Sequence, residues 1–192
     1  MSKVKRIFLT AGVCVTIAFV CLFGYLYLQN MFAEIFIRLG WETRSSVNLF
    51  TNGFWLAFLL YAVLPPLLEE LVFRFAVCKT LQWAKLKPWL IIGISAVLFM
   101  LYHRSWSQVV YQLIMGIFFA WIFLKTNNLL WTILIHFINN AFVVTYTYFT
   151  ASSSDTVFAL SAGNIIIAIS SALVATAAVT LLIKKGIPYA TK

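Results

Sequence analysis

The sequence contains very little charge. Only 10% of its 192 residues are charged, whereas soluble domains carry about 25%. Acidic residues are the scarcest, with 5 Asp and Glu against 14 Lys and Arg. Hydrophobic residues make up 63% of the chain and include 18 Phe, 7 Trp and 8 Tyr. So few charges cannot shield that much apolar surface from water. A soluble globular domain and a disordered chain are therefore excluded, and the composition predicts a polytopic membrane protein.

Cysteine is also scarce and forms no motif. Cys14, Cys21 and Cys78 show no Cys-x-x-Cys spacing, so we interpret them as small buried hydrophobic residues. The sequence has no glycine-rich phosphate loop, no His-Glu-x-x-His motif and no basic helix with interleaved aromatic residues. We therefore expect no nucleic-acid partner, and we attribute the net charge of +9 to loops on one side of a membrane.

Long apolar runs predict an all-α, polytopic transmembrane helical bundle of about six spans. Crossing a bilayer takes about 17–25 residues, and the runs lie at 7–29, 53–73, 88–103, 107–125, 129–149 and 163–183. The first run is longer than the core of a signal peptide and no cleavage site follows it, so we expect a retained helix. Residues 30–52 are expected to form an interfacial or extracellular segment. No repeat or linker divides the chain, which predicts a single transmembrane domain over 1–192.

The basic residues predict the orientation of this bundle. Ten Lys and Arg residues, and no acidic ones, lie in segments 1–6, 79–88, 125–128 and 184–192. An even number of spans places both termini on one side, and the charge bias makes that side cytoplasmic. We expect a multi-pass protein of a cell membrane. The short length and the lack of organelle features favour a bacterial plasma membrane.

Two of the five acidic residues are adjacent within an apolar run. Glu69 and Glu70 lie in the segment LPPLLEELVFRF. Ionisable groups at membrane depth are costly and are therefore functional candidates. Glu70 and Arg74 are four residues apart and can pair on one helix face. Glu69 is rotated by about 100° and has no local cation. The ion pair explains Glu70 and Arg74 as supporting residues, but it leaves Glu69 as a candidate for chemistry.

Two prolines, Pro65 and Pro66, precede the acidic pair. A proline lacks the backbone N–H and restricts the residue before it. We therefore expect the helix to be kinked or restarted at this place. Irregular helices at membrane depth are tolerated where they line a cavity, so the prolines favour a cavity close to Glu69.

Both histidines lie in or beside apolar runs. His103 ends the run at 88–103, and His136 lies inside the run at 129–149. Asn140 is four residues after His136 and shares its helix face. Asn139 points elsewhere, and we expect it to bond a neighbouring helix.

These residue types permit two kinds of hydrolytic chemistry. A carboxylate with a nearby histidine can deprotonate a water molecule. A histidine and an asparagine on an opposing helix can donate hydrogen bonds to a developing oxyanion. The alternative is a catalytic zinc ion held by Glu69, His103 and His136, with an open fourth position. The residue types alone do not separate water activated by Glu69 from water activated by zinc.

The order of these residues resembles the intramembrane proteases related to the CAAX prenyl endopeptidase and to bacteriocin-processing or bacteriocin-immunity proteins. That family shows EExxxR, then FxxxH, then HxxxN or HxxxD, each on a separate transmembrane helix. The matching segments here are 69–74, 99–103 and 136–140, and Gly116 and Phe119 ahead of the third also look family-like. The resemblance covers about residues 60–145. A glycine that often follows the motif arginine is Phe75 here.

The resemblance implies a role for each residue. Glu69 would activate water with the help of His103, and His136 and Asn140 would stabilise the oxyanion. Glu70 and Arg74 would be mainly architectural or would help to hold the substrate. The family is described both as metalloproteases and as glutamic proteases. We expect the metal-free glutamic type with no cofactor, because Glu69 and His103 already supply a base and its partner.

The expected substrate is a peptide or protein associated with the lipid bilayer. Two other functions stay open. The first is a catalytically silent membrane partner in bacteriocin immunity or signalling regulation, which would be expected to lose a motif residue. The second is a small transporter that couples cations through Glu69, which would be expected to show internal repeats. The sequence shows neither the loss nor the repeats.

The depth of the motif residues tests the catalytic hypothesis. Helices perpendicular to the membrane would place Glu69 near the cytoplasmic side and His103 near the outer side. His136 would lie between them, about 10 Å above the start of its helix at 1.5 Å per residue. A shared active site requires these depths to converge, through tilt or through the irregularity at Pro65 and Pro66. A separation by the full membrane core would refute the hypothesis.

Overall fold

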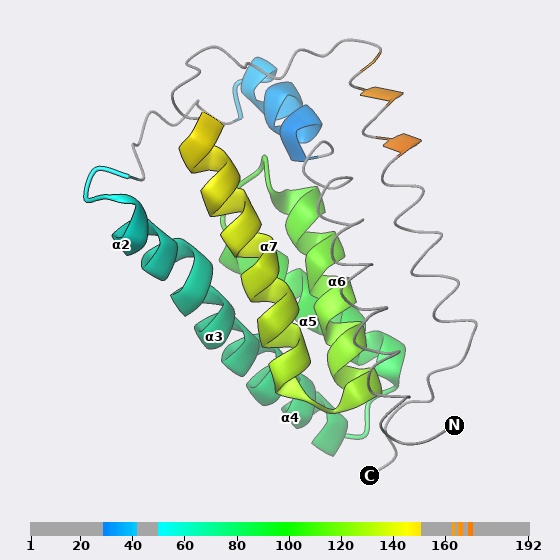
Figure 1. Cartoon of the computed structure of the whole chain (residues 1–192). Helices are drawn as coiled ribbons and strands as arrows, with labels where there is room; N and C mark the ends of the chain where they lie inside the picture. Colours follow the sequence, from blue (N-terminus) through cyan, green and yellow to red (C-terminus); the bar gives the residue numbers. More distant parts are fainter. Residues whose placement is uncertain (1–28, 42–49, 151–162, 164, 167–168, 171–192) are drawn as a thin grey trace.

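The structure is a computed structural model that describes residues 29–41, 50–150, 163, 165–166 and 169–170 (Figure 1). These residues contain helices and no strand, so the predicted all-α bundle is confirmed. The elements after a helix at 29–38 are α2 (Phe54–Phe58), η1 (Leu59–Val63), α3 (Leu64–Glu70), η2 (Leu71–Cys78), α4 (Lys79–Trp83), α5 (Pro88–Tyr102), α6 (Val109–Thr126) and α7 (Leu129–Thr150). Nearly all of the runs predicted at 7–29 and 163–183, the residues Cys14 and Cys21, and both termini lie outside the described residues. Cys78 is a buried free thiol, as predicted.

Three described helices are long and apolar enough to cross a membrane: Phe54–Trp83, Val109–Thr126 and Leu129–Phe149. The fourth apolar helix, α5, has 15 residues. Many apolar side chains on these helices are exposed, as they are where a helix faces lipid. The total of six spans stays a prediction.

The first of these helices is longer than its apolar run predicts. The run at 53–73 is part of a continuous helix of 30 residues, Phe54–Trp83, which joins α2, η1, α3, η2 and α4 (Figure 1). Its length of about 45 Å matches a bilayer with its headgroups. Trp55 and Trp83 lie near its two ends and are 79% and 72% exposed, as is typical of tryptophans at membrane interfaces. Glu69 therefore lies at the middle of a membrane helix and not near its cytoplasmic end.

The helix changes its hydrogen-bonding pattern where the sequence predicts an irregularity. The segments η1 and η2 are π-helical, and α3 between them begins with Pro65 and Pro66 in its first turn. The chain nevertheless continues as one helix through this place. The missing proline N–H groups are thus accommodated by a local change of helix type.

A tight turn then sends the chain back along this helix as α5. Lys85 in the turn is left-handed, with φ of 58°, and Pro88 lies in the first turn of α5, where its fixed φ is favourable. From Trp83 back to Glu69 is 14 residues, and from Pro88 forward to His103 is 15. The two arms of this helical hairpin therefore differ by only one residue, and they carry Glu69 and His103 to about the same level.

The turn between α6 and α7 produces a second match of levels. Asn127 ends α6 in a left-handed conformation, and Asn128 Oδ1 accepts a hydrogen bond from the backbone N–H of Leu130 at 2.9 Å. Lys79 Nζ of α4 donates to Asn127 Oδ1. Glu70 precedes Lys79 by nine residues, and His136 follows Asn127 by nine. The contact at the helix ends thus brings Glu70 and His136 to the same height.

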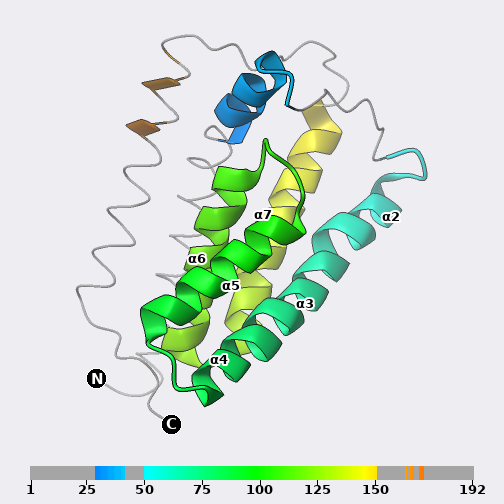
Figure 2. The same ribbon diagram turned by 180° about the vertical axis from the view of Figure 1, so that it is seen from behind.

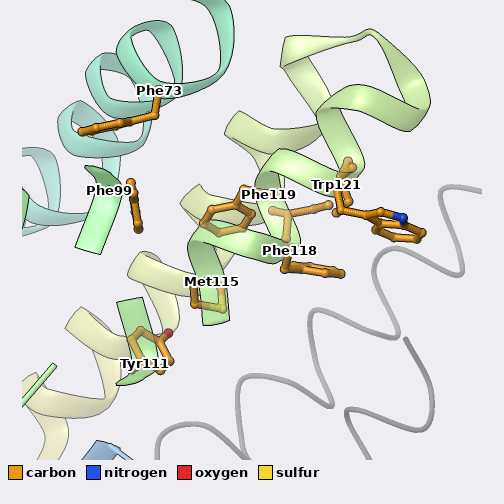
Figure 3. Close-up of a cluster of buried hydrophobic side chains, with 9 residues drawn as sticks. Phe73, Phe99, Tyr111, Met115, Phe118, Phe119 and Trp121 are labelled. Carbon is orange, nitrogen blue, oxygen red and sulfur yellow. The ribbon is translucent and has the colours of Figure 1, made fainter. Parts of the chain in front are cut away.

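The helices pack around an aromatic core. α7 lies against α3, η1 and α6, whereas α5 packs on α6 and η2 on the opposite side (Figures 1 and 2). The closest approach lies between α5 and α6, because a Cβ atom on Gly116 would be 2.8 Å from Ala96 Cα. Figure 3 shows Phe99 between Phe73 and Phe119, and its ring contacts both of theirs edge to face. The core also contains Tyr111, Met115, Phe118, Trp121, Ile122 and Ile135.

Replacing Gly116 by Ala is expected to destabilise the protein. The added methyl meets the backbone of Ala96, so α5 and α6 have to separate, at a cost of about 1–3 kcal/mol. Gly93→Ala is the matched control, because a Cβ atom there meets nothing within 4 Å. Thermal unfolding of both variants in detergent checks this, and equal melting temperatures would contradict the close contact.

Candidate active site

Three predicted residues converge from three different helices. Glu69 lies on α3, His103 follows the end of α5, and His136 lies on α7. His103 Nε2 and His136 Nε2 are each 3.8 Å from Glu69 Oε2. The structure therefore brings together residues that are 34 and 67 positions apart. The separation by the membrane core that would refute a shared site is not found among them.

Hydrogen bonds at the far ring nitrogens orient both histidines. His103 Nδ1 is 2.9 Å from the carbonyl oxygen of Phe99, which can only accept, so Nδ1 carries the proton. His136 Nδ1 is 2.9 Å from Glu70 Oε1. That oxygen is also 3.2 Å from Arg74 Nη1, so it acts as an acceptor and His136 Nδ1 also carries a proton. Both Nε2 atoms are thereby turned toward Glu69.

Glu70 and Arg74 form the buried ion pair that their spacing predicts. Both side chains are completely buried. Arg74 Nη2 also approaches the carbonyl oxygen of Gly116 on α6 at 3.5 Å. The guanidinium carbon lies 4.4 Å from the ring centre of Phe99 and 5.1 Å from that of Phe119. Aromatic faces thus supply much of the environment of this cation, which explains why phenylalanines accompany the polar motif residues.

Asn140 belongs to a chain of hydrogen bonds between three helices. Tyr111 Oη on α6 donates to Asn139 Oδ1 at 2.7 Å. Asn139 Nδ2 donates to Asn140 Oδ1 at 3.2 Å, and Asn140 Nδ2 donates to the carbonyl oxygen of Tyr61 in η1 at 3.1 Å. Asn139 thus bonds a neighbouring helix, as predicted, but it also touches Asn140.

All four predicted catalytic residues line one cavity of about 280 Å³. Glu69 Oε2 is buried, and it has no hydrogen-bond partner within the part of the chain that the structure describes. The other residues around the cavity are mostly polar or aromatic and include Gln29, Tyr61, Gln108, Tyr111, Gln112, Phe119 and Asn139. The cavity therefore offers an uncompensated carboxylate next to two imidazoles and several amides.

The sequence analysis missed the polar residues of α6. Gln112 Nε2 donates to Gln108 Oε1 at 3.1 Å, and both residues line the cavity with Tyr111. A signal was available, because polar side chains at the beginning of the apolar run at 107–125 are costly at membrane depth. They belong to none of the family motifs, so nothing in the sequence grouped them with Glu69.

The geometry also tests the zinc alternative. The described residues hold no group of three His, Cys, Asp or Glu side chains that could hold a metal ion. Ligands of a tetrahedral zinc with bonds of about 2.0–2.1 Å lie about 3.4 Å apart, whereas each Nε2 is 3.8 Å from Glu69 Oε2. The three side chains are thus a few tenths of an ångström farther apart than zinc ligands, and the choice between water activated by Glu69 and water activated by zinc stays a prediction.

The fold and the site define a membrane protein with a buried glutamate and histidine centre. The family model described as type II CAAX prenyl endopeptidase Rce1-like matches residues 51–142, which include every predicted site residue. This match supports membership of the CAAX-protease-like family. Comparisons with curated proteins and with solved structures found no match.

Replacing Arg74 by Ala is expected to reduce the folded yield strongly. The substitution leaves the carboxylate of Glu70 buried without its cation, which costs about 3–5 kcal/mol. Arg38→Ala is the matched control, since Arg38 also pairs with a glutamate four residues away but its side chain is 62% exposed. Its loss is expected to cost less than the loss of Arg74, since the exposed Arg38 stays largely in water. The measurement is the folded fraction after extraction, and equal yields would contradict the structural role of Arg74.

Proposed function

We propose that this chain is an intramembrane endopeptidase that cleaves a peptide bond in a membrane-associated peptide or protein. The observation that supports this proposal is the convergence of Glu69, His103 and His136 on one membrane-embedded cavity. The family match supports the same class of enzyme independently. A substrate within the bilayer is also expected, because the cavity lies near the middle of the membrane-spanning helices.

In this proposal Glu69 is the base that activates a water molecule. A water about 2.8 Å from both Glu69 Oε2 and His103 Nε2 donates one hydrogen bond to each, because His103 Nδ1 holds the ring proton and leaves Nε2 as an acceptor. This leaves an oxygen lone pair for attack on the scissile carbonyl carbon. Glu69 takes the proton of the attacking water as the new C–O bond forms.

His136 and Asn140 stabilise the oxyanion that this attack creates. His136 donates from Nε2 as the doubly protonated ring, with Glu70 Oε1 2.9 Å from Nδ1 and Glu69 Oε2 3.8 Å from Nε2. Asn140 donates its second N–H, since the first is used by Tyr61. Two donors aimed at a developing negative charge in a water-poor site lower the barrier substantially.

The tetrahedral intermediate then collapses with cleavage of the C–N bond. The electron pair of this bond leaves with the amine nitrogen, which receives the proton held by Glu69. The products are a carboxylic acid and an amine, and Glu69 is returned as a carboxylate. One water molecule is consumed in each cycle, and neither an electron nor a cofactor is required.

A catalytically silent membrane partner is the other candidate. The presence of all seven motif residues, with Glu69 facing the cavity, makes it the less favoured one. The charge distribution of the sequence supports cytoplasmic termini, and the short length and the lack of organelle features support a bacterial plasma membrane. In this orientation the basic turn at residues 84–87 faces the cytoplasm.

Replacing Glu69 by Gln is expected to abolish proteolysis while the protein still folds. The side chain keeps its size but can no longer accept a proton from water, so kcat is expected to fall at least about 10³-fold. The measurement compares peptide termini in membranes and medium of host cells with equal amounts of wild type or variant. Glu34→Gln is the matched control, because Glu34 is buried but is not among the residues that line the cavity.

Termini that disappear only in Glu69→Gln identify the substrates. Identical termini in all three strains, together with a host phenotype that persists in the variant, would favour the silent partner.

Chelation is expected to leave proteolysis intact. If water is activated by Glu69 and His103 alone, then dialysis of the purified protein against a zinc chelator removes nothing that the reaction needs. The measurement is cleavage of an identified substrate before and after dialysis, with the metal content determined in parallel. Loss of cleavage that zinc restores would show that the site closes by a few tenths of an ångström around a metal ion.

A further inference from the structure

The backbone carbonyl of Tyr61 cannot be satisfied by its own helix. In an α-helix it would accept from the N–H of residue 65, and in a π-helix from that of residue 66. Both residues are proline and have no N–H. The N–H of Leu64, the remaining neighbour, bonds the carbonyl oxygen of Leu59. The two consecutive prolines therefore leave the Tyr61 carbonyl unpaired within the helix, one turn before the cavity residue Pro65.

The amide of Asn140 satisfies this carbonyl. Asn140 Nδ2 donates to Tyr61 O at 3.1 Å across the contact between η1 and α7. At the other end of the amide, Asn140 Oδ1 accepts from Asn139 Nδ2. Asn139 is oriented in turn, because Tyr111 Oη donates to its Oδ1 at 2.7 Å. The orphaned carbonyl can only accept, so it sets the direction of every hydrogen bond in this series, and Tyr111 Oη supplies the donor that Asn139 Oδ1 then requires.

We propose that Tyr111 and the Pro65–Pro66 pair are positioning residues that fix the amide orientation of Asn140. The proposal rests on the proposed function, in which Asn140 binds the oxyanion. A flipped Asn140 amide would place its oxygen against the Tyr61 carbonyl and its nitrogen against Asn139 Nδ2. With both ends matched, the second N–H of Asn140 is the one group left to serve the cavity. The prolines therefore leave a free hydrogen-bond acceptor for Asn140 in addition to changing the local helix type.

A stability cycle tests the link between the prolines and Asn140 without any substrate. Asn140→Ala removes the donor from the Tyr61 carbonyl and is expected to lower the melting temperature in detergent by about 2–4 °C. In the Pro65→Ala background the N–H of the new alanine can take the carbonyl instead. The same Asn140 substitution is then expected to cost less than half as much. Equal costs in the two backgrounds would overturn the proposal for the prolines.

Measurements of kcat and KM test the role of Tyr111, at the other end of this series of hydrogen bonds. Tyr111→Phe keeps the ring but removes the donor that orients Asn139, so kcat is expected to fall about tenfold with KM unchanged. In the Asn140→Ala background the same substitution is expected to have no further effect on kcat. Tyr148→Phe is the matched control, because Tyr148 is half-exposed and packs its ring on Phe54 and Phe149 beyond the cavity.

The outcomes separate this proposal from the proposed function. A tenfold effect of Tyr111→Phe that persists without Asn140, or one that appears in KM, would show that Tyr111 acts in another way and would overturn its positioning role. A wild-type protein without peptidase activity would refute the proposed function. The stability cycle would still decide in that case whether the prolines hold Asn140, because it depends on no turnover.

Discussion

The burial of Arg74 is the constraint on which the rest of the described structure depends. A guanidinium cannot be left unpaired in a low-dielectric core, so its surroundings have to be assembled from several helices at once. Glu70 supplies the opposite charge, the Gly116 carbonyl on α6 lies beside Nη2, and Phe99 on α5 covers one face. Glu70 then holds His136 of α7. The long helix, α5 and α6 thus contact Arg74 directly, and α7 is linked to it through Glu70.

This arrangement gives two adjacent carboxylates opposite environments. Glu70 has its charge matched by Arg74 and a proton donor in His136, so it is committed to structure. Glu69, one position earlier on the same helix, lines the cavity, where its Oε2 is 3.8 Å from the Nε2 atoms of His103 and His136. In enzymes, two neighbouring carboxylates in different environments can serve as a fixed counter-ion and as a reactive group.

The sequence predicts which polar residues belong to the candidate site, but it does not predict how close they lie to one another. Glu69, His103 and His136 stand out because ionisable groups are rare in apolar runs, and the Glu70–Arg74 pair follows from helical spacing alone. Their meeting could not be predicted, because hydropathy misses the polar end of the long helix at Lys79–Trp83 and therefore misplaces the turn that sets their levels. The partners of Asn140 could not be predicted either, since Tyr111 and Tyr61 reach it only through tertiary packing.

The shortness of α5 has a consequence for the membrane itself. A helix of 15 residues is about 22 Å long, whereas the hydrocarbon core is about 30 Å thick. The polar loop that begins at His103 and contains Gln108 therefore lies below the lipid headgroups on the side opposite the basic turn. The bilayer next to it has to thin, or water has to follow the loop inward. Either response shortens the path along which water reaches the carboxylate of Glu69.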